Sequence, residues 1–122
     1  MSVENKRGSD RKDTLNLLDY VVIDEHGTKK ERAMARTLNV SEKGILVETH
    51  IRFEKGQELL ITIGLKNELF EVRGRVAHTE DCGLEAFCSG VEFFEVKPDE
   101  LIILRKFLEA FNKQQQERQS SD

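Results

Sequence analysis

Apolar and polar residues alternate with a period of two over much of the chain between residues 15 and 96. In residues 57–65, for example, Leu59, Ile61 and Ile63 share one face. Such alternation is typical of β-strands that bury one face. The expected strands are residues 15–23, 33–39, 44–51, 57–65, 69–78 and 84–96. Six short strands joined by polar turns predict a mainly β fold, a six-stranded antiparallel β-barrel.

The segment 69–78 predicts which side chains point into such a barrel. Its candidate inner face comprises Phe70, Val72, Gly74, Val76 and His78. The intervening residues are mostly charged, which is typical of the solvent-facing side of a strand. Polar loops or turns are expected at residues 24–32, 41–44, 53–56, 66–67 and 80–83.

The period changes after Pro98, which sits where a helix can begin because its fixed φ suits the first helical position. Asp99 and Glu100 follow, and acidic residues in a first turn favour the positive end of the helix dipole. Apolar residues then recur at helical spacing: Leu101, Leu104, Leu108 and Phe111, with Ile103 and Phe107 widening the stripe. We expect a C-terminal helix that packs on the barrel.

Length and composition place the chain among single-domain globular proteins. It has 122 residues, of which 38% are hydrophobic and 34% charged. The longest unbroken apolar run is four residues, whereas a membrane helix needs about 20. The first 14 residues contain no secretory apolar region, so we expect a cytoplasmic protein without membrane insertion. Cys82 and Cys88 are too few for a disulfide framework, and reduced thiols are expected.

The charge is unevenly distributed. The net charge is −4, but residues 1–12 carry +2 and the other 110 residues carry −6. The basic segment has few apolar residues with which to bury itself. We therefore divide the chain into a flexible basic arm (1–14), the barrel with its helix (15–112) and a polar frayed tail (113–122).

Nothing in the sequence assembles a catalytic site. His26, His50 and His78 fall in three different segments, and none of the common hydrolase, metalloprotease, phosphate-loop or dinucleotide motifs is present. No nucleophile, base and orienting group occur together. We expect a protein that is not an enzyme and that has no metal site and no cofactor.

Two short motifs carry candidate binding chemistry. In the arm, Arg7 and Arg11 stand four residues apart, and arginine can grip phosphate or the guanine edge with two parallel hydrogen bonds. In residues 39–44 (NVSEKG), Asn39 and Ser41 face the same side of an extended chain, and Gly44 permits a positive φ or a close approach of the backbone. A solvated tail and an ordinary capped turn are the structural alternatives.

Together these motifs resemble a PilZ domain, the bacterial receptor module for cyclic di-GMP (c-di-GMP). The resemblance rests on RxxxR at residues 7–11 and on the [D/N]xSxxG pattern at 39–44. The strand RGRVAH (73–78), the GVEF segment (90–93) and the final helix support it, so that it covers about residues 6–112. The family implies a six-stranded barrel with a C-terminal helix.

The resemblance also implies roles for individual residues. Arg7 and Arg11 would contact guanine and phosphate groups, and Asn39 and Ser41 would hydrogen-bond a guanine edge or a phosphate. Gly44 would keep the approach open. Asn39 stands where Asp is more frequent, and an amide lacks the carboxylate that accepts strongly from guanine N–H groups. This difference weakens or redistributes the contact.

Two further residues enter by the same resemblance. Lys6 precedes RxxxR, where the side chain influences whether one or two ligand molecules bind, and a basic residue favours two. His78 lies near the place where some members hold an aromatic residue against the ligand. It is either a stacking residue or a partly exposed strand residue.

The function expected from the sequence is a non-catalytic c-di-GMP receptor whose arm becomes ordered on binding and which signals in trans to a partner protein or through a homodimer. The alternative is a ligand-independent PilZ adaptor, although members of that kind usually lack the arginines. A nucleic-acid-binding barrel is disfavoured because the body is acidic and the chain has one tyrosine and no tryptophan for base stacking.

Overall fold

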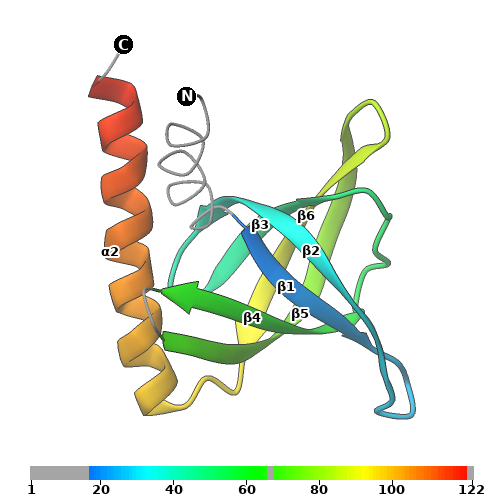
Figure 1. Ribbon diagram of the computed structural model, residues 1–122. Coiled ribbons are helices and arrows are strands. Elements are labelled where there is room, and N and C mark those ends of the chain that lie inside the picture. The colour runs from blue at the N-terminus through cyan, green and yellow to red at the C-terminus, as the bar shows by residue number, and fades with distance from the viewer. Residues whose placement is uncertain (1–16, 66–67, 121–122) are drawn as a thin grey trace, which may run out of the picture.

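The computed structural model describes residues 17–65 and 68–120. Six strands form a closed barrel in the order β1-β2-β3-β6-β5-β4, and every neighbouring pair is antiparallel (Figure 1). The elements are β1 (Leu17–Ile23), β2 (Lys29–Val40), β3 (Gly44–Thr49), β4 (Glu58–Leu65), β5 (Glu68–Gly83), β6 (Ala86–Phe94) and α2 (Pro98–Ser120). The mainly β fold class, the six-stranded antiparallel barrel and the C-terminal helix are confirmed.

The barrel interior is filled by the residues that the alternation assigned to it. Leu59, Ile61 and Ile63 of β4 are each 1% exposed. Val72 and Val76 of β5 are equally buried, while the intervening arginines are exposed. Burying one face of every strand removes apolar surface from water, and this burial is the main force that stabilises the barrel.

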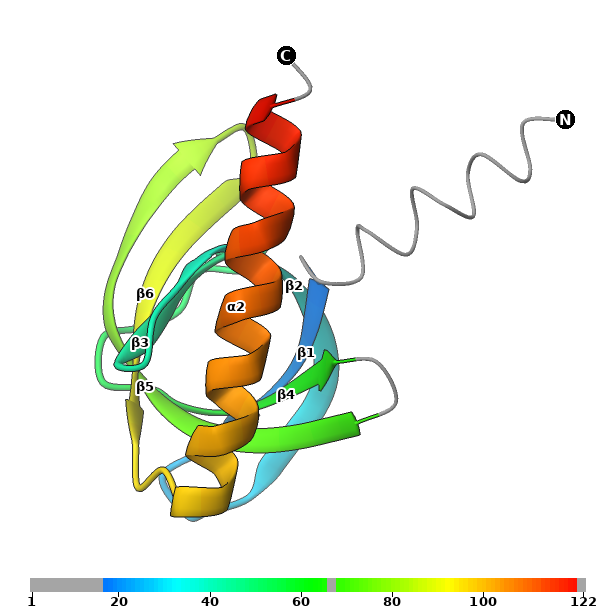
Figure 2. The same cartoon turned by 90° about the vertical axis from the view of Figure 1, so that its left-hand side faces the viewer.

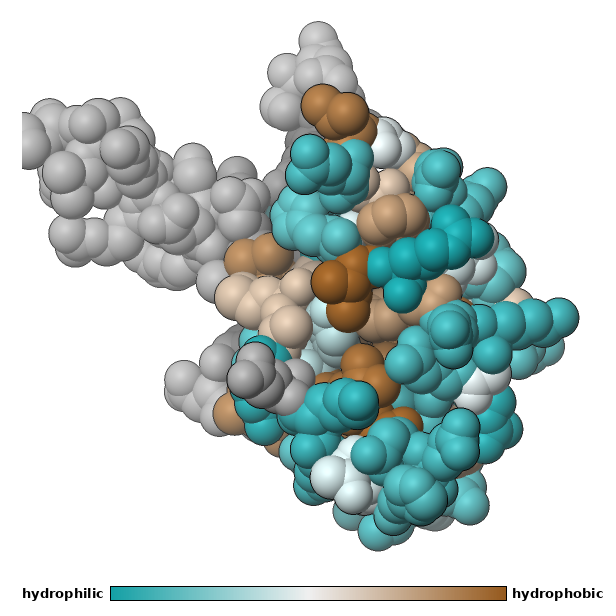
Figure 3. Space-filling view, turned by 90° about the vertical axis from the view of Figure 1, so that its right-hand side faces the viewer, coloured by the Kyte–Doolittle hydropathy of each residue, from teal (hydrophilic) through white to brown (hydrophobic). Residues whose placement is uncertain are grey.

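The helix α2 lies across one end of the barrel (Figure 2). Its stripe supplies Leu104, Phe107 and Phe111, all at most 1% exposed, to the same core cluster. At the opposite end, the segment between β3 and β4 inserts Phe53, whose ring meets Tyr20 edge-on with centroids 5.2 Å apart. On the side of the molecule away from α2, a few hydrophobic side chains are exposed among the surrounding hydrophilic ones (Figure 3).

Two connections differ from the sequence prediction. The loop expected at 24–32 is a shorter turn, because β2 already begins at Lys29 and Asp24 Oδ1 accepts hydrogen bonds from the N–H groups of His26 and Thr28. The turn expected at 80–83 is strand, because β5 continues to Gly83 and the chain reverses at residues 84–85. The expected connection at 66–67 lies outside the described residues.

The C-terminal helix is longer than expected. We placed its end at residue 112, but α2 continues to Ser120. The last turns are rich in Gln, Glu, Lys and Arg, which are good helix formers, so that polarity alone was a poor reason to end the helix there. Among the described residues, no helix is both long and apolar enough to span a membrane.

Candidate ligand-binding face

Four residues on four adjacent strands form a row on the outer surface of the barrel. Asn39 of β2 lies opposite Leu46 of β3, Leu46 lies opposite Gly90 of β6, and Gly90 lies opposite His78 of β5. Neighbouring strands are about 4.8 Å apart, so the row from Asn39 to His78 is about 14 Å long. Only the register of the strands brings these residues together; we call this row the outer row.

The turn between β2 and β3 begins beside Asn39 at one end of the outer row. Ser41 Oγ accepts hydrogen bonds from the backbone N–H groups of Lys43 (3.2 Å) and Gly44 (3.3 Å), and the Ser41 N–H donates to the Gly44 carbonyl (2.8 Å). Asn39 Oδ1 accepts from the N–H of Val40 (2.9 Å). The side chains of both Asn39 and Ser41 are exposed. The motif therefore forms a capped turn and also presents its polar groups to solvent.

Gly44 is required by the barrel itself. A Cβ on this residue would lie 2.5 Å from the carbonyl oxygen of Val91 in β6, closer than packed atoms allow. The positive φ considered as one reason for glycine here is found at other positions, Gly27 and Gly56, among the described glycines. The glycine of the motif thus allows β3 and β6 to approach closely.

His78 is on the outer surface, contrary to the simple alternation of β5. The β5–β6 register shifts between Val76 and His78, so a β-bulge at Ala77 turns His78 outward, where it is exposed. Its imidazole lies over Gly90, and a Cβ on Gly90 would overlap the ring atoms Cε1, Nδ1 and Nε2. The absence of a side chain at Gly90 lets the ring lie against the sheet.

Two shallow hollows flank the outer row. One, of about 400 Å³, is lined by residues that include Leu17, Met34, Arg36 and Glu48. The other, of about 420 Å³, lies beside the β2–β3 turn and is lined by Glu42, Lys43, Arg75, Glu92, Phe93, Phe94 and Val96. Each falls within the size range of small-molecule sites.

The second hollow combines an aromatic ring with basic groups. The Arg75 guanidinium lies 4.5 Å from the centroid of the Phe94 ring, and that of Arg73 lies 5.0 Å from it. Arg73 also donates to Glu58 and lies 2.7 Å from Glu95. The hydrogen bond that Arg73 donates to Glu58, together with the negative charges of Glu58 and Glu95, raises the pKa of Arg73 above its ordinary value. Arg73 is thus held by acidic partners within the surface.

Sequence reasoning missed a contact between the motif and the helix. Glu42, in the β2–β3 turn, forms an ion pair with Arg105 of α2 at 3.2 Å. The two residues are 63 positions apart, and both side chains are about half exposed. No sequence signal marks this pair, because it depends on where α2 crosses the end of the barrel.

The prediction of reduced cysteines is wrong. Cys82 and Cys88 form a disulfide, with Cα atoms 5.7 Å apart. The sequence argument counted cysteines and found too few for a framework, but one pair needs only a hairpin that brings its two members together. That hairpin is the end of β5 and β6, where Cys82 is the extra residue of a second register shift.

Lys6, Arg7 and Arg11 lie outside the described residues. His26, His50 and His78 are in three separate places, and His50 Nδ1 lies 3.2 Å from the carbonyl oxygen of Glu85. Within residues 17–65 and 68–120, no group of three or more His, Cys, Asp or Glu side chains could hold a metal ion.

Comparison with known proteins identifies the fold. One solved relative is the PilZ domain of YcgR from Escherichia coli, determined with c-di-GMP: the TM-score is 0.67 at 10% identity, over 87% of this chain and 89% of that one. Another is MrkH from K. pneumonia in its apo state, with a TM-score of 0.61 at 10% identity. The match covers 83% of this chain but only about half of MrkH (49%).

A third similar structure is the PilZ domain of CeSA from a cellulose-synthesizing bacterium, with a TM-score of 0.54 at 11% identity over 79% of this chain and 93% of that one. At such identities the likeness concerns the fold alone. A search of curated proteins gave no match. The family model described as PilZ domain matches residues 5–110, which is most of the chain. The chain therefore belongs to the PilZ domain family.

Proposed function

We propose that this protein is a non-catalytic receptor for c-di-GMP, bound between the arm residues Arg7 and Arg11 and the outer face of the barrel. On the barrel, Asn39 and Ser41 hydrogen-bond the ligand beside Gly44. His78 offers the flat face of its ring at the far end of the outer row, as a stacking surface for a base.

The proposal rests on the family match taken together with the geometry of the outer row. The match over residues 5–110 includes both RxxxR and NxSxxG, and a structure of the same fold, the PilZ domain of YcgR, was determined with c-di-GMP. The exposed polar groups of the turn and the His78 ring are about 14 Å apart on one surface. An elongated ligand with a base at each end can contact both.

The arm is long enough to close over this surface. Arg11 precedes Leu17 by six residues, which span at most about 20 Å when extended. Leu17 pairs with Arg36, three residues before Asn39 on the neighbouring strand, so that Leu17 and Asn39 are about 11 Å apart. Arginine side chains add further reach, and the net charge of +2 on residues 1–12 attracts a phosphate ligand.

The mechanism we infer is ordering of the arm on binding. The phosphates attract Arg7 and Arg11, and the ligand fixes the arm against the barrel. The fraction of chains in this closed state depends on how much more tightly the ligand binds it than the open state. Lys6 adds a charge that favours two stacked ligand molecules per chain. A partner protein, or a second copy of the chain, then recognises the covered surface in the cytoplasm.

Calorimetric titration with c-di-GMP tests the proposal. The wild-type chain should release heat, and Arg7→Ala and Arg11→Ala should each weaken binding at least about tenfold, because each removes charge-assisted hydrogen bonds. Lys12→Ala removes an arm charge outside the motif and is the matched control. Absence of wild-type binding would favour the ligand-independent adaptor, and unchanged affinity in both arginine variants would refute the role of the arm.

The same titration measures stoichiometry. Two ligands per chain are expected, falling to one in Lys6→Ala. One ligand per wild-type chain would contradict the role given to Lys6.

A further inference from the structure

The end of the β5–β6 hairpin extends past the last pair between β5 and β4, and the Arg52–Asp81 contact joins it to the β3–β4 loop. β4 pairs with β5 only as far as Arg75, and Val76 hydrogen-bonds the loop at Gly56 and Gln57. Within the described part of the chain, residues 77–83 of β5 pair in the sheet with β6 alone. We call residues 77–88 the hairpin end.

Two bulges divide this hairpin end. The β5–β6 register shifts between Val76 and His78 and again between Asp81 and Gly83. Residues 78–81 therefore form a short ladder between them, with His78 opposite Gly90 and Glu80 opposite Cys88. His78, the candidate stacking residue, belongs to this ladder, whose sheet partner is β6 alone.

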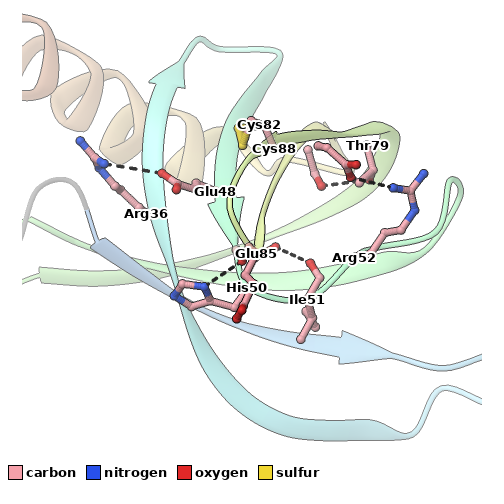
Figure 4. Close-up of a disulfide and its surroundings, with 12 residues drawn as sticks. Arg36, Glu48, His50, Ile51, Arg52, Thr79, Cys82, Glu85 and Cys88 are labelled. Carbon is pink, nitrogen blue, oxygen red and sulfur yellow. Dashed lines mark hydrogen bonds and ion pairs between the residues drawn. A yellow bond between two sulfur atoms is a disulfide. The ribbon is translucent and has the colours of Figure 1, made fainter.

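A disulfide closes this ladder (Figure 4). Cys82 is the bulged residue of the second shift, and Cys88 lies two residues from Gly90 on the same outward side of β6. Cys82 is exposed, whereas Cys88 is only 9% exposed. A thiol in solution therefore reaches the cystine from the Cys82 side. The bond itself joins the last residues of β5 to β6.

We propose that Cys82–Cys88 is a reversible redox site whose oxidised state holds His78 in place on the ligand-binding face. This inference rests on the proposed function. A dithiol reductant attacks Cys82 Sγ, forms a mixed disulfide and releases the Cys88 thiolate, which takes up a proton. The second thiol of the reductant then displaces Cys82, so that two electrons and two protons pass to the protein and the reductant becomes a cyclic disulfide.

Reduction loosens the ligand site. Without the disulfide, the ladder of residues 78–81 lies between two bulges with no covalent cross-link inside the hairpin, so more of its ordering must be completed when ligand binds. We expect the reduced chain to bind c-di-GMP at least about fivefold more weakly. By linkage, saturating ligand favours the disulfide over the dithiol by the same fivefold factor. This factor lowers the midpoint potential of the disulfide by about 20 mV, because the couple transfers two electrons.

The test compares the full chain before and after treatment with dithiothreitol, with the thiols counted by alkylation and mass spectrometry. Calorimetry should give the weaker c-di-GMP binding after reduction, and amide exchange of residues 77–83 should accelerate. The double variant Cys82→Ser/Cys88→Ser should bind like the reduced wild type and ignore dithiothreitol. In His78→Ala the affinities of the oxidised and reduced forms should become equal.

The outcomes separate this inference from the proposed function. No binding in either redox state overturns the proposed function itself. Equal binding in both states, with the function intact, overturns the redox site. A redox difference that persists in His78→Ala refutes the route through His78, and alkylation of both cysteines in the air-oxidised chain would show that the pair is not bonded.

Discussion

The two halves of β5 have different roles: one fills the core, and the other carries a candidate ligand-binding residue on the outer surface. Residues 68–76 pair with β4 as far as Arg75 and with β6 from Arg73 onward, and they send Phe70 and Val72 into the core. Residues 77–83 have β6 on one side only and carry His78 outward. The first half is fixed by the burial of alternate side chains and by its pairing with β4, to which β6 is added from Arg73; the second is fixed by β6, by the disulfide and by the Arg52–Asp81 contact.

This difference shows where the barrel can accommodate a ligand. A segment that buries alternate side chains in the core cannot shift without exposing them to water, whereas a largely exposed segment paired on a single side can adjust at a lower free-energy cost. The bulge at Ala77 marks the change, because it ends the core alternation and begins the outer face. Variants that affect stability should therefore separate from variants that affect binding along β5.

The largest expected effect is on residues 68–76, the half of β5 that the core anchors. Phe70→Ala removes a ring that is 6% exposed and should lower the free energy of unfolding by about 3–5 kcal/mol. The matched control is Leu69→Ala, the adjacent residue, which is 75% exposed and should change it by less than about 0.5 kcal/mol. Urea denaturation measures both. Equal effects would show that this half is not the anchored one.

The next effect is on ligand binding through residues 77–83, the half of β5 that carries His78. Gly90→Ala places a methyl group where the His78 ring lies, so the exposed ring must rotate away from the sheet. We expect c-di-GMP affinity to fall about tenfold, or about 1.4 kcal/mol, with unfolding free energy changed by less than about 1 kcal/mol. Calorimetry and urea denaturation on the same preparation separate the two quantities.

Gly83→Ala is the control for this variant in the same hairpin. A Cβ on Gly83 would meet its nearest atom, Cβ of Ala86, at an ordinary 3.7 Å. Affinity and stability should both stay near the wild-type values. A tenfold loss in both variants would mean that binding depends on the flexibility of the hairpin and not on the place of His78.

The comparison of the two halves also explains what the sequence could predict. Period-two alternation correctly assigned Phe70, Val72 and Val76 to the core, because a strand that buries one face has apolar residues at alternate positions. It failed at His78, since a bulge inserts one residue without any change in the composition around it. The helix stripe was found for the same reason as the strand faces, while the polar end of α2 was misread as a tail.

The candidate site divides in a similar way. Asn39, Ser41 and Gly44 were found because they lie within six consecutive residues. Gly90 beside His78, the Cys82–Cys88 bond and the Glu42–Arg105 pair depend on strand register and on the path of α2. Periodicity predicts which face a residue occupies, but it does not predict which residue of another strand will lie opposite.

The smallest expected effect concerns the ion pairs that Arg73 forms in residues 68–76, the anchored half of β5. Arg73 bonds Glu58 of β4 and Glu95 just after β6, so its side chain joins both neighbours of β5 on the outer surface. Arg73→Gln keeps much of the stem and removes the charge; it should lower the melting temperature slightly at low salt, and the difference should shrink as salt screens the wild-type pairs. Ligand affinity should not change, because Arg73 is itself paired with both β4 and β6 and lies in the half of β5 that the core anchors. A loss of affinity would mean that the anchored half also holds the ligand site in place, and the division of β5 into two halves would then be wrong.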